Sequence, residues 1–273
     1  MRNSAPNAAQ QTAAEAATAA RQVVAGWWGI VRLAAQLLEL ALTRSTWRRD
    51  SWHTLARHIV QDTTPMLGWF AVLTTLISVV VIRIVIVTAL SYGLTQYALE
   101  MVVRVLVLEL IPLTAAIFVA LRCTLPDGVE LAELRARGEL NTLTEHGIDP
   151  IRREALPRVV AGVFLVWMLV SVSCIISLLL AYFTIYGFTP WAFSGYTRVV
   201  GQVFSPAVSV ILLLKTLFFS VAVSLIPMAA ALYDNVAAPL HSRSKAAREL
   251  ASMVRLFAVI LLIEVASIVG NYY

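Results

Sequence analysis

The sequence is poor in charged residues and in cysteine. Of its 273 residues, 14% are Asp, Glu, Lys or Arg, whereas soluble domains carry about 25% charged residues. The two cysteines, Cys123 and Cys174, are too few for a disulfide framework or a zinc site. The four histidines lie in polar segments without the spacing of metal ligands. We therefore predict no metal site.

Motifs for nucleotide binding and for serine hydrolysis are also missing. The sequence contains no GxxxxGK[ST] phosphate loop and no GxSxG elbow. We therefore predict no catalytic residues and no cofactor in this chain. Any nucleotide chemistry in which it takes part must come from another chain.

Long apolar stretches are what the sequence has in abundance, since 59% of its residues are hydrophobic. Five stretches are long enough to cross a bilayer as helices. We predict spans at Pro65–Tyr92, Met101–Leu121, Val159–Tyr186, Pro206–Leu232 and Leu250–Val269. The predicted fold class is an all-α integral membrane protein, with residues 65–273 as its five-span domain.

The first 64 residues have a different character. Residues 1–22 lack the basic flank and apolar core of a signal peptide, and we expect a disordered cytoplasmic tail. In residues 23–42, the polar side chains of Arg32, Gln36 and Glu39 share one helical face. This pattern favours an amphipathic elbow helix in the membrane interface over a full span, followed by a cationic connector up to residue 64.

Basic residues gather in alternate loops. The segment before span one and the loops between spans two and three and between four and five are rich in arginine, whereas the other two loops carry only Arg198. The positive-inside rule places the arginine-rich loops and the N-terminus in the cytoplasm and the C-terminus outside. Topology thus explains the net charge of +5, and we expect no nucleic-acid partner.

The longest polar interval lies within Glu109–Arg158, between the second and third spans. Asp127–Arg137 alternates carboxylates and guanidiniums at helical spacing, and Gly147–Ile151 reads as a turn. A polar segment of this kind cannot lie in lipid. We expect it in water, available to a soluble partner, and Glu130 and Arg122 are placed where they could pair.

This interval resembles the MlaE/YrbE permease family, the membrane subunits of ABC transporters that work with MCE proteins to move lipids across the bacterial envelope. The resemblance makes these structural motif residues: Glu109, Pro112, Arg122, Glu130, Pro150 and Arg158. The chain departs from the family at several glycines, whose places are taken by Ile111, Leu121, Thr124 and Ala132. Glycines let helices approach closely, so these departures concern helix packing.

The resemblance implies a permease subunit in the bacterial inner membrane that moves phospholipid or another hydrophobic lipid between that membrane and a periplasmic MCE protein. Its partners would be an ABC ATPase subunit, which holds ATP and Mg, and a second permease chain, identical or unlike. It also implies a coupling helix over Leu134–Glu145, ended by Gly147 and followed by a helix from Pro150. The residues offered to the ATPase would be Arg135, Arg137, Glu139, Leu140, Leu143, Glu145 and Asp149.

Charged residues inside predicted spans give candidates for a lipid path. Arg83, Lys215 and Glu264 are costly at that depth, so each should pair within the bundle or engage a lipid headgroup, and Arg83 could instead snorkel to the surface. We expect Glu109 to be a structural ion-pair partner within the bundle and not a ligand of the substrate. Two other functions stay open: a non-transporting scaffold of the same complex, and an ion-coupled carrier using Glu109 and Glu264, against which the lack of an internal repeat speaks.

Overall fold

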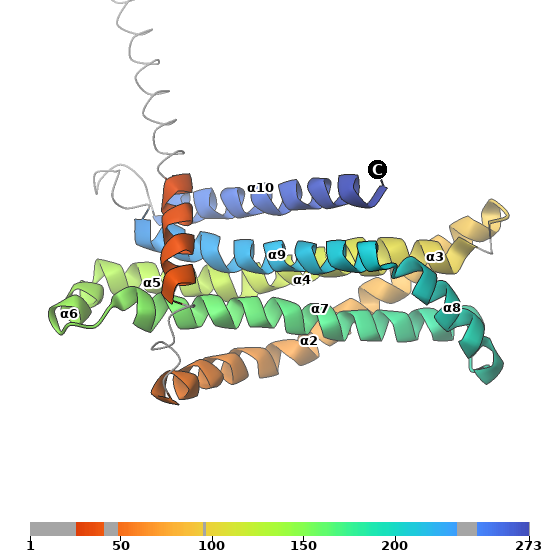
Figure 1. The fold of residues 1–273 in the computed structure, drawn as a ribbon, viewed down its shortest axis with the longest axis horizontal. Coiled ribbons are helices and arrows are strands. Elements are labelled where there is room, and N and C mark those ends of the chain that lie inside the picture. The colour runs from red at the N-terminus through yellow and green to blue at the C-terminus, as the bar shows by residue number, and fades with distance from the viewer. Residues whose placement is uncertain (1–25, 41–48, 95–96, 234–244, 273) are drawn as a thin grey trace, which may run out of the picture.

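All regular structure in the described part of the chain is helical (Figure 1). The computed structural model describes residues 26–40, 49–94, 97–233 and 245–272, and the predicted tail 1–22 lies outside these. Within them, five helical segments are long and apolar enough to cross a membrane: Met66–Ser91, Ala98–Ala136, Ile151–Tyr186, Pro206–Tyr233 and Leu250–Gly270. The predicted all-α membrane fold with five spans is confirmed.

The spans are built from the following elements. Span one is the later part of α2 (Arg49–Ser91), and span two is a continuous run of α3 (Ala98–Val102), η3 (Val103–Leu110), α4 (Ile111–Val119), η4 (Ala120–Thr124) and α5 (Leu125–Ala136). Span three is η5 (Ile151–Ala155) with α7 (Leu156–Tyr186), span four is α9 (Pro206–Tyr233) and span five is α10 (Lys245–Tyr272). Here η3, η4 and η5 are π-helical turns.

The helices differ from the predicted spans and loops at several points, and span three starts at Ile151 instead of Val159. Helix α2 begins at Arg49, inside the predicted connector. Span two continues to Ala136, because a helix that leaves the lipid can go on in water once its polar face begins. The predicted loop Gly187–Ser205 holds η6 (Pro190–Ala192) and α8 (Phe193–Val203), and its glycines Gly195 and Gly201 lie within α8.

The long helices run side by side (Figure 1). Helix α7 packs between α2 and α9, span two packs against both α7 and α9, and α10 packs mainly against α9. Two buried hydroxyl pairs join α2 to α7: Ser78 to Ser177 at 2.7 Å and Thr74 to Ser173 at 3.1 Å. Interhelical hydrogen bonds of this kind hold helices together where lipid gives no hydrophobic driving force.

A short helix over residues 26–40 runs across the ends of the long helices (Figure 1). Its 15 residues span about 22 Å, less than the roughly 30 Å of a bilayer core. It packs on the end of α9, where Leu33 is fully buried and Gln36 accepts a 2.7 Å hydrogen bond from the Tyr233 hydroxyl. The guanidinium of Arg32 lies 5.8 Å from the centre of the same ring.

The opposite end of the bundle is aromatic. Tyr182, Tyr186, Phe193 and Tyr196 contact one another where α7 ends and α8 begins. The Tyr196 hydroxyl donates to the carbonyl of Leu178 at 2.8 Å. Burial, with a smaller contribution from Tyr186, raises the pKa of Tyr196 to about 12, so this hydroxyl stays a donor at physiological pH.

Candidate functional site

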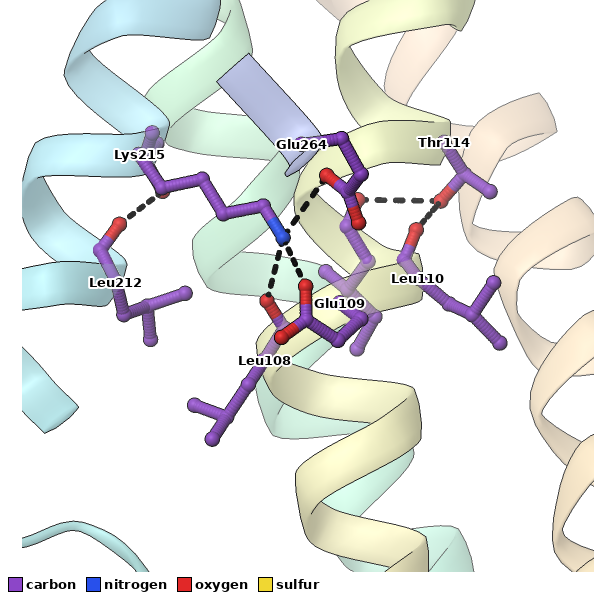
Figure 2. A network of polar contacts seen from close by, with 9 residues as sticks. Leu108, Glu109, Leu110, Thr114, Leu212, Lys215 and Glu264 are labelled. Carbon is purple, nitrogen blue, oxygen red and sulfur yellow. Dashed lines mark hydrogen bonds and ion pairs between the residues drawn. The ribbon is translucent and has the colours of Figure 1, made fainter. Parts of the chain in front are cut away.

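Three charged side chains from three spans meet inside the bundle (Figure 2). They are Glu109 on η3, Lys215 on α9 and Glu264 on α10. The Lys215 ammonium donates a hydrogen bond to Oε2 of Glu109, and it lies 2.9 Å from Oε2 of Glu264. The three side chains are 1% (Lys215), 14% (Glu109) and 12% (Glu264) exposed. We refer to these three residues as the charge cluster.

The backbone carbonyl of Leu108 is the fourth group at this site, and Pro112 removes its usual α-helical donor. In an ordinary α-helix, the carbonyl of Leu108 would accept from the N–H of residue 112, which is proline and has none. The turn before it is π-helical, with the N–H of Ile111 donating to the carbonyl of Leu106. Lys215 Nζ donates to the Leu108 carbonyl oxygen at 3.2 Å. The Glu109 carboxylate and the Leu108 carbonyl, which lacks its α-helical donor because of Pro112, therefore both accept from the Lys215 ammonium.

The charge cluster ties span two, span four and span five together electrostatically. A buried charge is strongly disfavoured unless it is paired, and its pairing is strong because few water molecules screen it. For Lys215 and Glu264, this pairing is one of the two roles that the sequence leaves open. Helix α10, which otherwise leans mainly on α9, is joined to span two through Lys215.

Arg83 stands apart from the charge cluster. It is exposed on α2, and no ion pair to it is found in the part of the chain that the structure describes. It lies eight residues before Ser91, about 12 Å from that end of the span. Its side chain therefore faces lipid or a surface that another molecule covers.

The second candidate site is the polar hairpin made of α5, which is the end of span two, and α6 (Glu139–Glu145), which follows it. The predicted continuous helix Leu134–Glu145 is wrong, because Gly138 adopts a left-handed conformation with φ of +79° and breaks it. The expected turn is confirmed: α6 ends before Gly147, whose φ is +74°, and η5 follows Pro150. Oδ1 of Asp149 accepts from the N–H of Ile151 at 3.0 Å.

The residues expected to meet an ATPase divide into two groups. Arg137, Glu139, Glu145 and Asp149 are exposed. The other three face the bundle. Leu140 is buried, Leu143 packs against the same hydrophobic cluster, and half-buried Arg135 donates to the carbonyl of Ala231 at 3.2 Å. The hairpin is thus anchored on one side and charged on the other.

Glu130 pairs with Arg158, not with Arg122 as the sequence suggested. Nη2 of Arg158 lies 3.0 Å from Oε1 of Glu130 and 3.5 Å from Oε2 of Glu154. Arg122 is exposed, and no ion pair to it is found within the described residues. Eight helical residues separate positions 122 and 130, a rise of about 12 Å, which is too far for direct contact. The Glu130–Arg158 pair links the end of span two to the start of span three.

Two close contacts between helices could not be predicted from the sequence. The Cβ of an alanine at position 162 would lie 2.6 Å from Oγ of Ser224, and one at position 128 would lie 3.1 Å from the carbonyl oxygen of Pro227. Gly162 and Gly128 thus permit close approach to α9. Glycine in a helix hints at such approaches, but it does not say which helix comes near. Among the described residues, no group of His, Cys, Asp and Glu has the arrangement of a metal site.

Five apolar helices with charged groups buried between three of them are the architecture of a multi-pass membrane protein. Residues 55–269 match the family model described as Permease MlaE. The chain belongs to the MlaE permease family. It is a membrane permease component of a lipid ABC transporter, a transport subunit and not a catalytic enzyme. A comparison with curated proteins finds no match.

Proposed function

We propose that the chain is the permease subunit of an ATP-driven transporter that moves phospholipid or another hydrophobic lipid between the bacterial inner membrane and a periplasmic MCE protein. ATP and Mg would be held by a separate ABC ATPase subunit. The observation that carries this proposal is the family match over 55–269 together with the charged, exposed helix α6 between spans two and three.

The hairpin is connected so that motion of a bound ATPase would be transmitted to spans two and three. Helix α5 is the last segment of span two, and η5 is the first segment of span three. The Glu130–Arg158 pair joins the two ends, and Leu140 anchors α6 to the bundle. A partner that binds Arg137, Glu139, Glu145 and Asp149 would therefore move both spans as one body.

The cytoplasmic side of the membrane is the natural place for this hairpin. It lies in the most arginine-rich loop, which puts the N-terminus inside and the C-terminus in the periplasm. The helix over 26–40, packed across the same end, would then lie in the cytoplasmic interface.

The lipid path would run along surfaces that the single chain leaves open. Only 22% of span one and 11% of span five are buried within the chain. A second permease chain, identical or unlike, would cover part of these apolar faces and enclose the path. Exposed Arg83 is the candidate for a phosphate headgroup, while Lys215 and Glu264 would take part only when their mutual contact opens.

Co-expression of the chain with an ABC ATPase and an MCE protein encoded by neighbouring genes tests the proposal. We expect the three to purify together and to transfer labelled phospholipid in proteoliposomes only when ATP is present. A complex that forms but transfers no lipid would favour the scaffold alternative. Transfer that follows a proton or sodium gradient and ignores ATP would favour an ion-coupled carrier. Failure to recover any ATPase would overturn the proposal.

A further inference from the structure

Three large aromatic side chains are exposed on the segment that joins spans three and four, at the end of the bundle opposite α6 (Figure 1). Trp191 in η6 is 91% exposed, Phe188 just before η6 is 88% exposed, and Phe193 opens α8 and is also exposed. Rings of this size are costly to leave in water, so a group of them marks a surface that another molecule covers. We refer to these three residues as the aromatic corner.

Hydrogen bonds tie the backbone of the aromatic corner to the end of α7. The Tyr182 hydroxyl donates to the carbonyl of Thr189 at 2.6 Å. The Thr189 hydroxyl donates in turn to the carbonyl of Tyr186 at 2.7 Å, at the end of the helix, where backbone donors run out. The N–H of Ala192 also donates to the Thr189 carbonyl, at 3.2 Å. The exposed rings therefore belong to an ordered turn.

One side of the aromatic corner continues the outer surface of span three. On α7 the exposed side chains recur every three or four residues and so form one stripe along the helix. The stripe consists of Phe164, Met168, Ser171, Ile175, Leu179 and Phe183. On a membrane span such a stripe lies in the apolar layer of the bilayer. The ring of Phe188 lies 4.9 Å from that of Phe183, centre to centre, so this apolar surface extends onto the corner.

The other side of the aromatic corner continues into a polar surface. Helix α8 buries Tyr196 and Val203 against the bundle and exposes Thr197, Arg198 and Gln202. A face that carries a guanidinium and an amide belongs in water or among lipid headgroups and not among acyl chains. The aromatic corner therefore lies where the apolar layer of the bilayer meets water.

The extent of the apolar surface favours lipid over a soluble protein as the molecule that covers the corner. From Phe188 the exposed apolar side chains continue along α7, into the membrane, whereas the exposed residues that follow Phe193 on α8 are small or polar. Tryptophan is enriched at membrane–water interfaces because its ring is apolar and its indole N–H is polar. Trp191 has both the residue type and the position of such an interfacial side chain.

We propose that the aromatic corner is a membrane anchor, with Phe188, Trp191 and Phe193 seated in the headgroup and upper acyl region of the bilayer. The indole N–H of Trp191 donates to a lipid ester or phosphate oxygen, and the two phenylalanine rings contact the upper part of the acyl chains. The anchor fixes the depth of span three at the end opposite the hairpin. The proposal concerns how the protein sits in the bilayer and does not rest on lipid transport.

Fluorine NMR of the full chain in phosphatidylcholine nanodiscs measures the depth of Trp191. The chain is labelled with fluorotryptophan, and the resonance that is missing in Trp191→Phe, or in Trp191→Tyr, belongs to this residue. A lipid spin-labelled near its headgroup should broaden the Trp191 resonance more than a lipid spin-labelled at the end of its acyl chain. Trp167, near the middle of span three, is the internal control and should show the opposite order.

A water-soluble gadolinium chelate separates the anchor from its alternatives. If the chelate broadens the Trp191 resonance and neither spin-labelled lipid does, the corner lies in water and the proposal is overturned. If the chelate effect then disappears when an MCE protein is added, the corner is a protein-docking surface and not a membrane anchor. The same depth order for Trp191 and Trp167 would also contradict the proposal. The measurement needs neither ATP nor transport, so its failure leaves the proposed function untouched.

Discussion

Lys215 on span four lies 2.9 Å from Glu264 on span five, and the same ammonium donates to Glu109 on span two. One lysine thus connects three membrane helices. In sequence it stands 106 residues from Glu109, so only the folded bundle brings these groups together. The first prediction concerns this lysine.

Lys215→Met should destabilise the protein severely. Removing one partner of a buried ion pair leaves the other charge uncompensated, which typically costs about 3–5 kcal/mol. Unfolding in mixed detergent micelles, followed by circular dichroism, measures the loss. Arg104→Met is the matched control, because its pair with Glu100 is partly exposed and contributes roughly 1 kcal/mol or less. Equal losses of stability from the two substitutions would show that the charge cluster stabilises the bundle no more than a partly exposed ion pair does.

Gly162→Ala should weaken the packing of α7 on α9. The added Cβ would meet Oγ of Ser224 at 2.6 Å, and overpacking of this kind costs about 1–3 kcal/mol. Ser224→Ala removes that oxygen and should restore part of the loss in the double variant. Gly201→Ala is the control, since nothing lies within 4 Å of the Cβ added there. A neutral Gly162→Ala would mean that these helices are less closely packed than described.

Gly138→Ala should impair coupling more than stability. Its φ of +79° disfavours any residue with a Cβ, by about 1–2 kcal/mol, and the strain would favour joining α5 and α6 into one helix. We expect ATP hydrolysis in the assembled complex to continue while lipid transfer per ATP falls. Gly93→Ala carries a similar strain, with φ of +68°, in the turn after α2, and it should leave that ratio unchanged.

Reversing the exposed charges of the hairpin should weaken binding of the ATPase. Arg137→Glu and Glu139→Arg each place a wrong charge on the surface that we assign to that partner. A loss of about tenfold in affinity corresponds to roughly 1.4 kcal/mol, and co-purification or surface plasmon resonance can measure it. Arg198→Glu, an exposed change on α8, serves as the control. If Arg198→Glu had the larger effect, the assignment of the docking surface would be wrong.

Much of the fold was predictable because membrane spans follow a simple rule. A long apolar run must form a helix in lipid, so Pro206–Leu232 and Leu250–Val269 were located almost to the residue. The segment Leu134–Glu145 was harder. Its charges favour helix throughout, and only the conformation of Gly138 reveals the break. Glycine is permitted in a helix, so sequence alone could not decide.

Partners across the bundle were the least predictable feature. The sequence indicated that Lys215 and Glu264 need partners but not that they are each other's. It suggested Arg122 for Glu130, which in fact pairs with Arg158. Pairing between spans depends on how helices rotate and pack, and a π-helical turn such as η3 shifts that rotation. No local pattern in the sequence records it.

The most direct test of the account is ATP-dependent lipid transfer by the reconstituted complex. Proteoliposomes would contain this chain, its ATPase and a labelled phospholipid, with the MCE protein supplied outside. We predict that transfer between the membrane and the MCE protein requires ATP and is lost when Arg137 and Glu139 are both reversed. Transfer that proceeds equally without ATP, or a chain that associates with no ATPase, would contradict the account.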